Sequence, residues 1–222
     1  MEELTRKIEE GLSCTMDENG CCIVPNDKNQ LDWAYWDNQW AAGQTGWDIG
    51  YVAPALKEWF DSIIDKSAAI LIPGCGNAYE AEYFLNKGFN NITVIDIAPS
   101  AVRILKEKFK NREGIRILEG DFFSLEGEYD IIVEQTFFCA IDPSLRENYC
   151  EQMARLLKKD GILGGLLFDR TFEQGPPFGG CKCEYTPLFH KSGLEVTEMN
   201  ITDGSIPERM GTELFFKSRS KK

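Results

Sequence analysis

Short apolar runs alternate with amphipathic segments along most of this 222-residue chain. The runs at 68–72, 92–95, 115–118, 130–134 and 162–168 predict strands that are covered on both faces, because they lack strict alternation of apolar and polar residues. Helical periodicity is present at 53–65, around 78–85, from 99 onward and from 142 to about 159. In the last of these helices, Lys158 and Lys159 suit the C-terminal turn, and Gly161 is expected to end the helix. This alternation indicates a mainly parallel sheet with helices on both faces.

The end of the chain breaks the alternation. Two strand-like runs, at 194–199 and 212–217, have no helix between them and predict an antiparallel pair that finishes the sheet. We therefore expect a Rossmann-like α/β fold with a seven-stranded, mostly parallel sheet and an antiparallel last strand. Residues 1–52, with a turn-rich loop at 13–30, are predicted to form an N-terminal helical and aromatic lid on the ligand-binding domain at 53–222, within a single domain overall.

Charge and composition exclude several classes of protein. The net charge of −12 argues against a nucleic-acid or anionic-membrane partner, because phosphates need a basic face. The charged start argues against a signal peptide, and the absence of a long apolar run argues against a membrane span. We therefore expect a cytoplasmic, monomeric protein that acts on a small molecule. The eight cysteines fit no trusted metal spacing and are expected to be free thiols; no metal is predicted, and the single histidine, His190, is given no catalytic role.

Three successive strand ends carry residues suited to a nucleotide-like ligand. The first is followed by Gly74 and Gly76, which let the backbone turn sharply before a helix N-terminus; a plain strand-to-helix turn is the alternative. Asp96 lies about twenty residues later, where a carboxylate can accept both ribose hydroxyls or else merely cap the next helix. Asp121 and Phe122 follow the third strand and offer a polar group and an aromatic wall for an adenine.

The tryptophans before the domain favour a cationic ligand. Trp36 and Trp40 share one helical face and Trp47 is close in sequence, and aromatic faces attract cations such as a sulfonium; three core tryptophans are the alternative. With the antiparallel last pair, this favours a class I methyltransferase fold that uses S-adenosyl-L-methionine and releases S-adenosyl-L-homocysteine. A Rossmann oxidoreductase that uses NAD, and a non-catalytic protein that binds S-adenosylmethionine, remain as alternatives.

Several motifs together resemble one family. They are the tryptophan segment, 73–76, Phe137-Phe138-Cys139-Ala140-Ile141-Asp142-Pro143 with Arg146 and Tyr149, Gly175-Pro176-Pro177-Phe178, and Ile206-Pro207-x-Arg209-x-Gly211-x-Glu213. From about Trp36 to near the C-terminus, the chain resembles the thiopurine S-methyltransferase superfamily, and most closely its thiol/halide methyltransferase branch.

The resemblance implies methyl transfer to a small soft nucleophile: a thiol, hydrosulfide, thiocyanate, halide or thiopurine. It implies cofactor contacts at Trp36, Trp40, Trp47, Gly74, Asp96, Asp121, Phe122 and Gln135, and it makes Gln135, Asp169 and Phe178 candidates for the substrate pocket. Gln135 departs from the arginine and the tyrosine of related enzymes, which weakens a thiopurine and leaves a halide open, whereas Asp169 resembles the thiopurine branch.

A soft nucleophile brings its own lone pair, so in-line displacement from a sulfonium requires no dedicated general base; the enzyme would contribute positioning and the exclusion of water. We expect Trp36 and Trp40 to close over the cofactor and the loop at 175–178 to cover the substrate. No catalytic residue is assigned with certainty.

Overall fold

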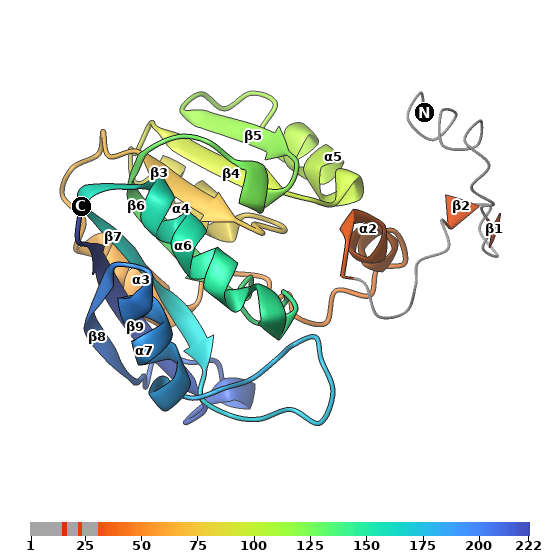
Figure 1. Ribbon diagram of the computed structural model, residues 1–222. Coiled ribbons are helices and arrows are strands. Elements are labelled where there is room, and N and C mark those ends of the chain that lie inside the picture. Colours follow the sequence, from red (N-terminus) through yellow and green to blue (C-terminus); the bar gives the residue numbers. More distant parts are fainter. Residues whose placement is uncertain (1–14, 17–21, 24–30) are drawn as a thin grey trace.

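A seven-stranded sheet runs through the middle of the molecule, with the strand order β5-β4-β3-β6-β7-β9-β8 (Figure 1). The computed structural model describes residues 15–16, 22–23 and 31–222. The strands of the sheet are β3 (Ile70–Pro73), β4 (Ile92–Asp96), β5 (Ile115–Glu119), β6 (Tyr129–Gln135), β7 (Leu157–Phe168), β8 (Leu194–Ile201) and β9 (Glu213–Ser220). Neighbouring strands from β5 to β7 are parallel, whereas β9 is antiparallel to both β7 and β8. The predicted sheet is therefore confirmed.

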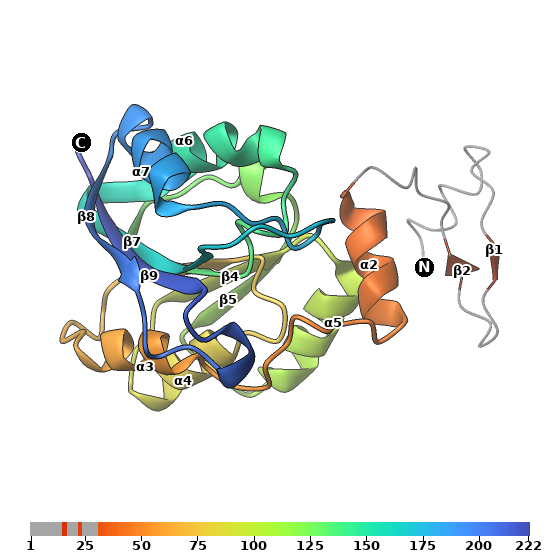
Figure 2. The ribbon, with the colours of Figure 1, turned by 90° about the horizontal axis from the view of Figure 1, so that it is seen from below.

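Helices cover both faces of this sheet, as predicted (Figures 1 and 2). They are α3 (Pro54–Asp61), α4 (Tyr79–Asn86), α5 (Pro99–Lys108), α6 (Arg146–Leu156) and α7 (Lys182–Lys191), whereas α2 (Trp33–Ala41) lies against α5 beyond the strands. The 3-10 turns are η1 (Phe122–Ser124), η2 (Pro143–Leu145) and η3 (Pro207–Arg209). On one face, α3, α4 and α5 bury Phe60, Phe84 and Leu105. On the other, α6 and α7 bury Tyr149 and Phe189. Among the described helices, none is long and apolar enough to cross a membrane.

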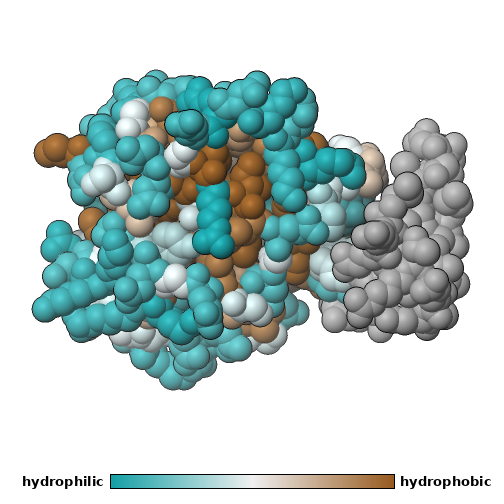
Figure 3. Space-filling model, turned by 90° about the horizontal axis from the view of Figure 1, so that it is seen from above, coloured by the Kyte–Doolittle hydropathy of each residue, from teal (hydrophilic) through white to brown (hydrophobic). Residues whose placement is uncertain are grey.

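The edge strand β5 is less buried than the inner strands β3 and β4. β3 and β4 are buried along their whole length, whereas β5, at one edge, is half-buried with exposed positions. Figure 3 looks at the molecule from the side on which β5 lies, and it shows a band of apolar side chains bordered by hydrophilic ones. This edge position explains why the run at 115–118 includes Arg116 while the inner strand β3 is entirely apolar.

The boundary between α6 and β7 differs from the prediction. Lys158 and Lys159 lie in β7, and not in the last turn of the helix, which ends at Leu156. The backbone here follows a register shift opposite Tyr129, with Asp160 at a φ of +60°. A Cβ on Gly161 would lie 2.9 Å from the carbonyl oxygen of Lys158, so this glycine is needed for a close approach within the strand and does not stop a helix.

The limits of two helices also differ from the prediction. The predicted helix at 53–65 ends already at Asp61, where the Ser62 hydroxyl donates to the carbonyl of Trp59 at 2.6 Å; Ile64, predicted on the apolar stripe, is 91% exposed. The predicted cap at Asp142 is present, but it caps η2 by accepting the amide of Ser144 at 2.8 Å, and α6 begins at Arg146. Within 13–30, predicted as a loop, only the paired two-residue strands β1 (Thr15–Met16) and β2 (Cys22–Ile23) are described.

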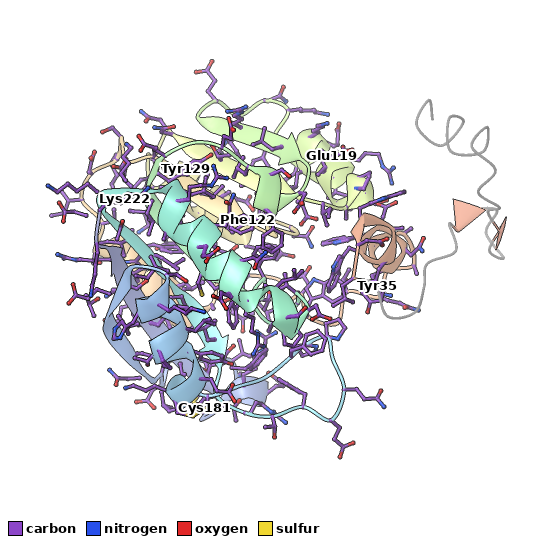
Figure 4. The ribbon with its side chains drawn as sticks, viewed as in Figure 1. Tyr35, Glu119, Phe122, Tyr129, Cys181 and Lys222 are labelled. Atoms are coloured by element: carbon purple, nitrogen blue, oxygen red, sulfur yellow. A yellow bond between two sulfur atoms is a disulfide. The ribbon has the colours of Figure 1, made fainter. Side chains whose placement is uncertain are left out.

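One pair of cysteines corrects the expectation of free thiols. Cys181 and Cys183 form a disulfide at the start of α7, with Cα atoms 5.2 Å apart (Figure 4). Cys181 has extended backbone just before the helix, so the change of direction brings together two side chains that would not face each other within a helix. Cys75, Cys139 and Cys150 are buried and free, as expected, while the side chains of Cys14, Cys21 and Cys22 lie outside the described residues.

Candidate active site

A cavity of about 950 Å³ opens at the carboxyl ends of the central strands. In Figure 4, Glu119 at the end of β5 and Tyr35 on α2 lie on this side, whereas Tyr129 at the start of β6 lies at the opposite end of the sheet. Seven of the eight residues predicted to contact the cofactor line the cavity: Trp36, Trp40, Trp47, Gly74, Asp96, Asp121 and Phe122. Positions far apart in sequence therefore meet at the edge where parallel α/β sheets bind ligands.

The loop after β3 has an unusual backbone. Gly74, Gly76 and Ala78 have φ of +56°, +50° and +49°, a region that only glycine adopts readily. A Cβ on Gly74 would overlap the ring of Phe137, and one on Gly76 would lie 3.2 Å from the indole of Trp40. Both glycines are thus required by conformation and by close packing, and their amides lie next to the N-terminus of α4.

Asp96 links this loop to the next one. The side chain, 7% exposed, accepts the amide of Gly76 at 3.0 Å on one oxygen and the amide of Ala98 at 2.9 Å on the other. Burial raises the pKa of the Asp96 carboxyl, and its hydrogen bonds to backbone amides oppose that rise. Asp96 therefore holds the turn before α5, whose N-cap residue is Ala98, and it also lines the cavity; its contact with a ribose stays a prediction.

The end of β5 supplies a polar and an aromatic group side by side. Asp121 is exposed and accepts the amide of Phe123 at 2.9 Å, which starts η1. Phe122 is buried with its ring centroid 5.2 Å from that of Phe137, in an edge-to-face arrangement. These contacts fix Phe122 as a rigid wall beside an accessible carboxylate.

The tryptophan cover consists of Trp36, Trp40 and Trp47. Trp47 packs edge-to-face against both others, with centroid distances of 5.5 Å to Trp36 and 6.2 Å to Trp40. Asp37 on α2 accepts the amide of Ser100 at 2.6 Å, and Arg209 donates to the carbonyl of Trp47 at 3.1 Å. The cover is therefore fastened to the body of the molecule from both sides of the cavity.

Three predicted residues are not in the wall of the main cavity. Gln135 lines a neighbouring space of about 50 Å³, together with Gly74, Trp40 and Trp47. Its Oε1 is buried without a hydrogen-bond partner among the described residues. Phe178 donates its amide to the carbonyl of Cys139 at 2.7 Å, and Asp169 accepts the amide of Lys182 at 3.2 Å; neither lines the cavity.

The C-terminal half of the chain provides the opposite wall, which sequence reasoning missed in part. This C-terminal wall consists of Phe168, Arg170, Phe172, Pro176, Pro177, Glu208 and Arg209. Arg209 and the two prolines belong to motifs noted in the sequence, but nothing in the spacing of residues singles out Arg170 or the two phenylalanines. These residues share one wall because the ends of β7 and η3 lie beside each other in the fold.

A buried acid behind the cavity was also missed. Glu134 is fully buried at the end of β6 and accepts the amides of Phe137 and Phe138 at 2.8 and 2.9 Å and the Tyr149 hydroxyl at 2.5 Å. Burial raises the pKa of Glu134 to about 7, although these hydrogen bonds lower it. Thr136, between Glu134 and Phe137 in the sequence, has a φ of +59°, which is rare for a β-branched residue; such strained residues cluster at functional sites.

Comparisons with known proteins agree with this geometry. The family described as thiopurine S-methyltransferase matches residues 31–216. A probable thiol methyltransferase 2 of Arabidopsis thaliana is 29% identical, with 80% of this chain and 81% of that protein covered. Thiocyanate methyltransferase 1 of Brassica oleracea is 27% identical (88% and 91% covered), and thiopurine S-methyltransferase of Photobacterium profundum 25% (81% and 92%).

Solved structures show the same fold at lower identity. The Burkholderia thailandensis 1,6-didemethyltoxoflavin-N1-methyltransferase, crystallised with S-adenosylhomocysteine, superposes with a TM-score of 0.69 at 16% identity, covering 95% of this chain and 100% of that one. A TehB-like S-adenosylmethionine-dependent methyltransferase of Corynebacterium glutamicum gives 0.61 at 21% identity, covering 84% and 95%. The family match spans most of the chain, so this protein belongs to the thiopurine S-methyltransferase family and is an S-adenosylmethionine-dependent methyltransferase.

Proposed function

We propose that this protein methylates the sulfur of a small thiol or of a comparable soft nucleophile such as hydrosulfide or thiocyanate. The observation that carries the proposal is a cavity of about 950 Å³, in which a tryptophan and acid wall suited to a cationic methyl donor faces the C-terminal wall. The names of the thiol, thiocyanate and thiopurine methyltransferase relatives support sulfur as the acceptor atom.

The residues present fit S-adenosylmethionine. Asp96 would accept the ribose hydroxyls, Phe122 and Asp121 would hold the adenine, and the tryptophan cover would lie over the sulfonium. The buried Oε1 of Gln135 accepts no hydrogen bond from the described residues, which suits the ammonium of the methionine part. The neighbouring loop amides at Gly74 and Gly76 suit its carboxylate. We assign α2 and the cover to a lid on this site.

When bound, the cofactor supplies an electrophilic methyl group on a cationic sulfur. The acceptor's lone pair forms the new bond while the electron pair of the broken bond stays on the departing sulfur. The chain's contribution is to orient the acceptor and to exclude water. Cys139 lines the cavity, but burial raises the pKa of its thiol to about 12, so it stays protonated and does not compete for the methyl group.

A panel of acceptors tests the proposal. Purified enzyme with labelled S-adenosylmethionine is offered an alkanethiol, hydrosulfide, thiocyanate, iodide and a thiopurine, while calorimetry compares its affinity for S-adenosylhomocysteine and NAD. We expect tight binding of S-adenosylhomocysteine alone, and turnover with the thiol, hydrosulfide and thiocyanate. Binding without turnover of any acceptor in the panel would indicate a non-catalytic protein, and turnover of iodide alone would equally refute the proposal of a sulfur acceptor.

The choice among sulfur acceptors, the cytoplasmic location and the monomeric state are part of this proposal. Gln135 replaces the residue types that mark the thiopurine and halide branches, so we rank a thiopurine and iodide below the small thiols in the panel. Size-exclusion chromatography with light scattering measures the oligomeric state directly.

A further inference from the structure

Arg170 is an exposed guanidinium in the wall of the cavity. It follows β7 by two residues, and the amide of Gly180 donates to its carbonyl at 2.9 Å in an isolated antiparallel bridge. Its side chain lies over the ring of Phe172, 4.7 Å from the centroid. Within the described part of the chain it has no ion pair and no side-chain hydrogen bond. A backbone hydrogen bond and the ring of Phe172 thus position Arg170, while none of the described carboxylates pairs with its charge.

The other arginine of this wall is already neutralised. Arg209 forms an ion pair with the buried carboxylate of Glu213 at 3.3 Å, and it donates to the carbonyl of Trp47 at 3.1 Å. Its guanidinium lies 5.4 Å from the ring of Phe168, which in turn packs edge-to-face against Phe172 at 5.1 Å. The row Arg209, Phe168, Phe172 and Arg170 thus begins with a paired charge and ends with a free one.

Size argues that the acceptor is more than a single atom. Ligand pockets range from about 300 to 1,000 Å³, and this cavity of about 950 Å³ is near the upper end. It has room for a methyl donor at the tryptophan cover and for an organic acceptor along the C-terminal wall. A nucleophile the size of a halide would leave the row of phenylalanines and Arg170 without a ligand to contact.

We infer that Arg170 binds a carboxylate of the acceptor, so that the preferred substrates are thiols joined by a short chain to a carboxylate group. This inference rests on the proposed function and names the substrate class of the same site. A guanidinium pairs with a carboxylate through two parallel hydrogen bonds, and stacking on Phe172 orders its fork before the acceptor arrives. Arg170 is thus a specificity-determining residue at the far end of the acceptor, away from the reacting sulfur.

A matched pair of acceptors isolates this charge. 3-Mercaptopropionate and 3-mercaptopropanamide have the same chain and differ by a carboxylate against a neutral amide. For the unaltered enzyme we expect a kcat/KM about fivefold or more in favour of the carboxylate after correction for thiolate content. Arg170→Gln should abolish the preference by raising KM for the carboxylate alone. Arg103→Gln, an equal loss of charge on the exposed side of α5 outside the cavity wall, is the control and should keep it.

Binding gives a second readout that does not depend on turnover. With S-adenosylhomocysteine bound, calorimetry measures the affinity of the methylated products, 3-(methylthio)propionate and its amide, for the same variants. The inference is overturned if the two acceptors and products behave alike in the unaltered enzyme, or if Arg170→Gln weakens acid and amide equally. Those results leave the proposed function standing when both thiols are methylated; absence of turnover with every thiol refutes the proposed function and the inference together.

Discussion

Asp96 joins the conformation of the loop to the binding of the ligand in one carboxylate. Because each oxygen holds a backbone amide, Asp96→Asn places an NH₂ group against an N–H donor and removes the charge that strengthens both bonds. We expect the affinity for S-adenosylhomocysteine to fall at least about tenfold, measured by calorimetry. Asp61→Asn, on the exposed end of α3, is the control. An unchanged affinity in a folded Asp96→Asn variant would show that Asp96 does not serve the cofactor.

A second prediction at the scale of a residue concerns the effect of Glu134 on the pH dependence of stability. Its pKa of about 7, against an ordinary 4.5, means that the folded protein holds the proton more tightly than the unfolded chain does. The contribution of Glu134 to stability is therefore fully present below about pH 4.5 and is lost as the pH rises from about 4.5 to 7. In Glu134→Gln this loss disappears, so its free energy of unfolding should gain roughly 2–3 kcal/mol on that of the unaltered protein between about pH 5 and pH 8.

Chemical denaturation across this pH range measures the difference. Glu80, also buried with a pKa raised to about 7, is present in both proteins and cancels. Glu151→Gln, on the exposed side of α6, is the matched control and should give a difference that does not change with pH. A constant difference for Glu134→Gln as well would mean that its hydrogen bonds to Tyr149 and the 137–138 amides keep the carboxylate charged throughout.

At the scale of elements, α2 caps a helix to which it is not joined in sequence. The N-cap residue of α5 is Ala98, which has no side-chain oxygen, and Asp37 of α2 accepts the amide of Ser100 instead. A carboxylate at a helix N-terminus also interacts favourably with the helix dipole. Asp37 thus replaces a local cap and holds the tryptophan cover against the body.

Asp37→Ala tests this tie. Loss of a cap costs about 1 kcal/mol of stability, and a loosened cover should weaken S-adenosylhomocysteine binding about fivefold. Four of the five tryptophans lie between residues 33 and 47, so tryptophan fluorescence reports mainly on this segment and should change less on ligand addition in the variant. Lost stability with an unchanged affinity would place Asp37 in a purely structural role. Asp65→Ala, which removes a local turn bond outside the cavity wall, is the control.

The elements that the sequence predicted well are those defined by local pattern. β3 and β4 are buried apolar runs followed by Gly74 and Asp96, and parallel topology then forces their ends to one edge. Local pattern could not show contacts across the fold, such as the cap that Asp37 gives α5 and the place of Gln135 in the neighbouring space. Nor could it show the backbone hydrogen bonds of Phe178, whose amide donates to Cys139 and whose carbonyl accepts from Arg146. Strand β7 likewise starts where helix periodicity continues, because its pairing with Tyr129 outweighs the helical preference of the lysines.

At the scale of the whole molecule, charge is distributed unevenly around one cavity. The chain carries −12 overall, and Asp96 and Asp121 lie at the strand ends, whereas the C-terminal wall holds Glu208 and two arginines, of which Arg209 is paired with Glu213. The carboxylates at the strand ends favour a cationic donor on that side, and Arg170 favours an anionic group of the acceptor on the other. Under the proposed function, this cavity would hold the donor and the acceptor together away from water, with no proton to be removed by the enzyme.

This arrangement predicts how the rate depends on pH. His190, the single histidine, is exposed on α7 outside the cavity wall, and the Cys139 thiol has its pKa raised to about 12, so neither serves as a base near neutrality. Between about pH 7.5 and 9.5, above the titration of Glu134, kcat/KM for an alkanethiol should rise with the thiolate fraction of the acceptor. Thiocyanate is an anion throughout, so its profile should be flat. A thiocyanate rate that rises in parallel with the thiol rate would reveal an ionising group on the enzyme, because the acceptor itself then contributes nothing to the pH dependence.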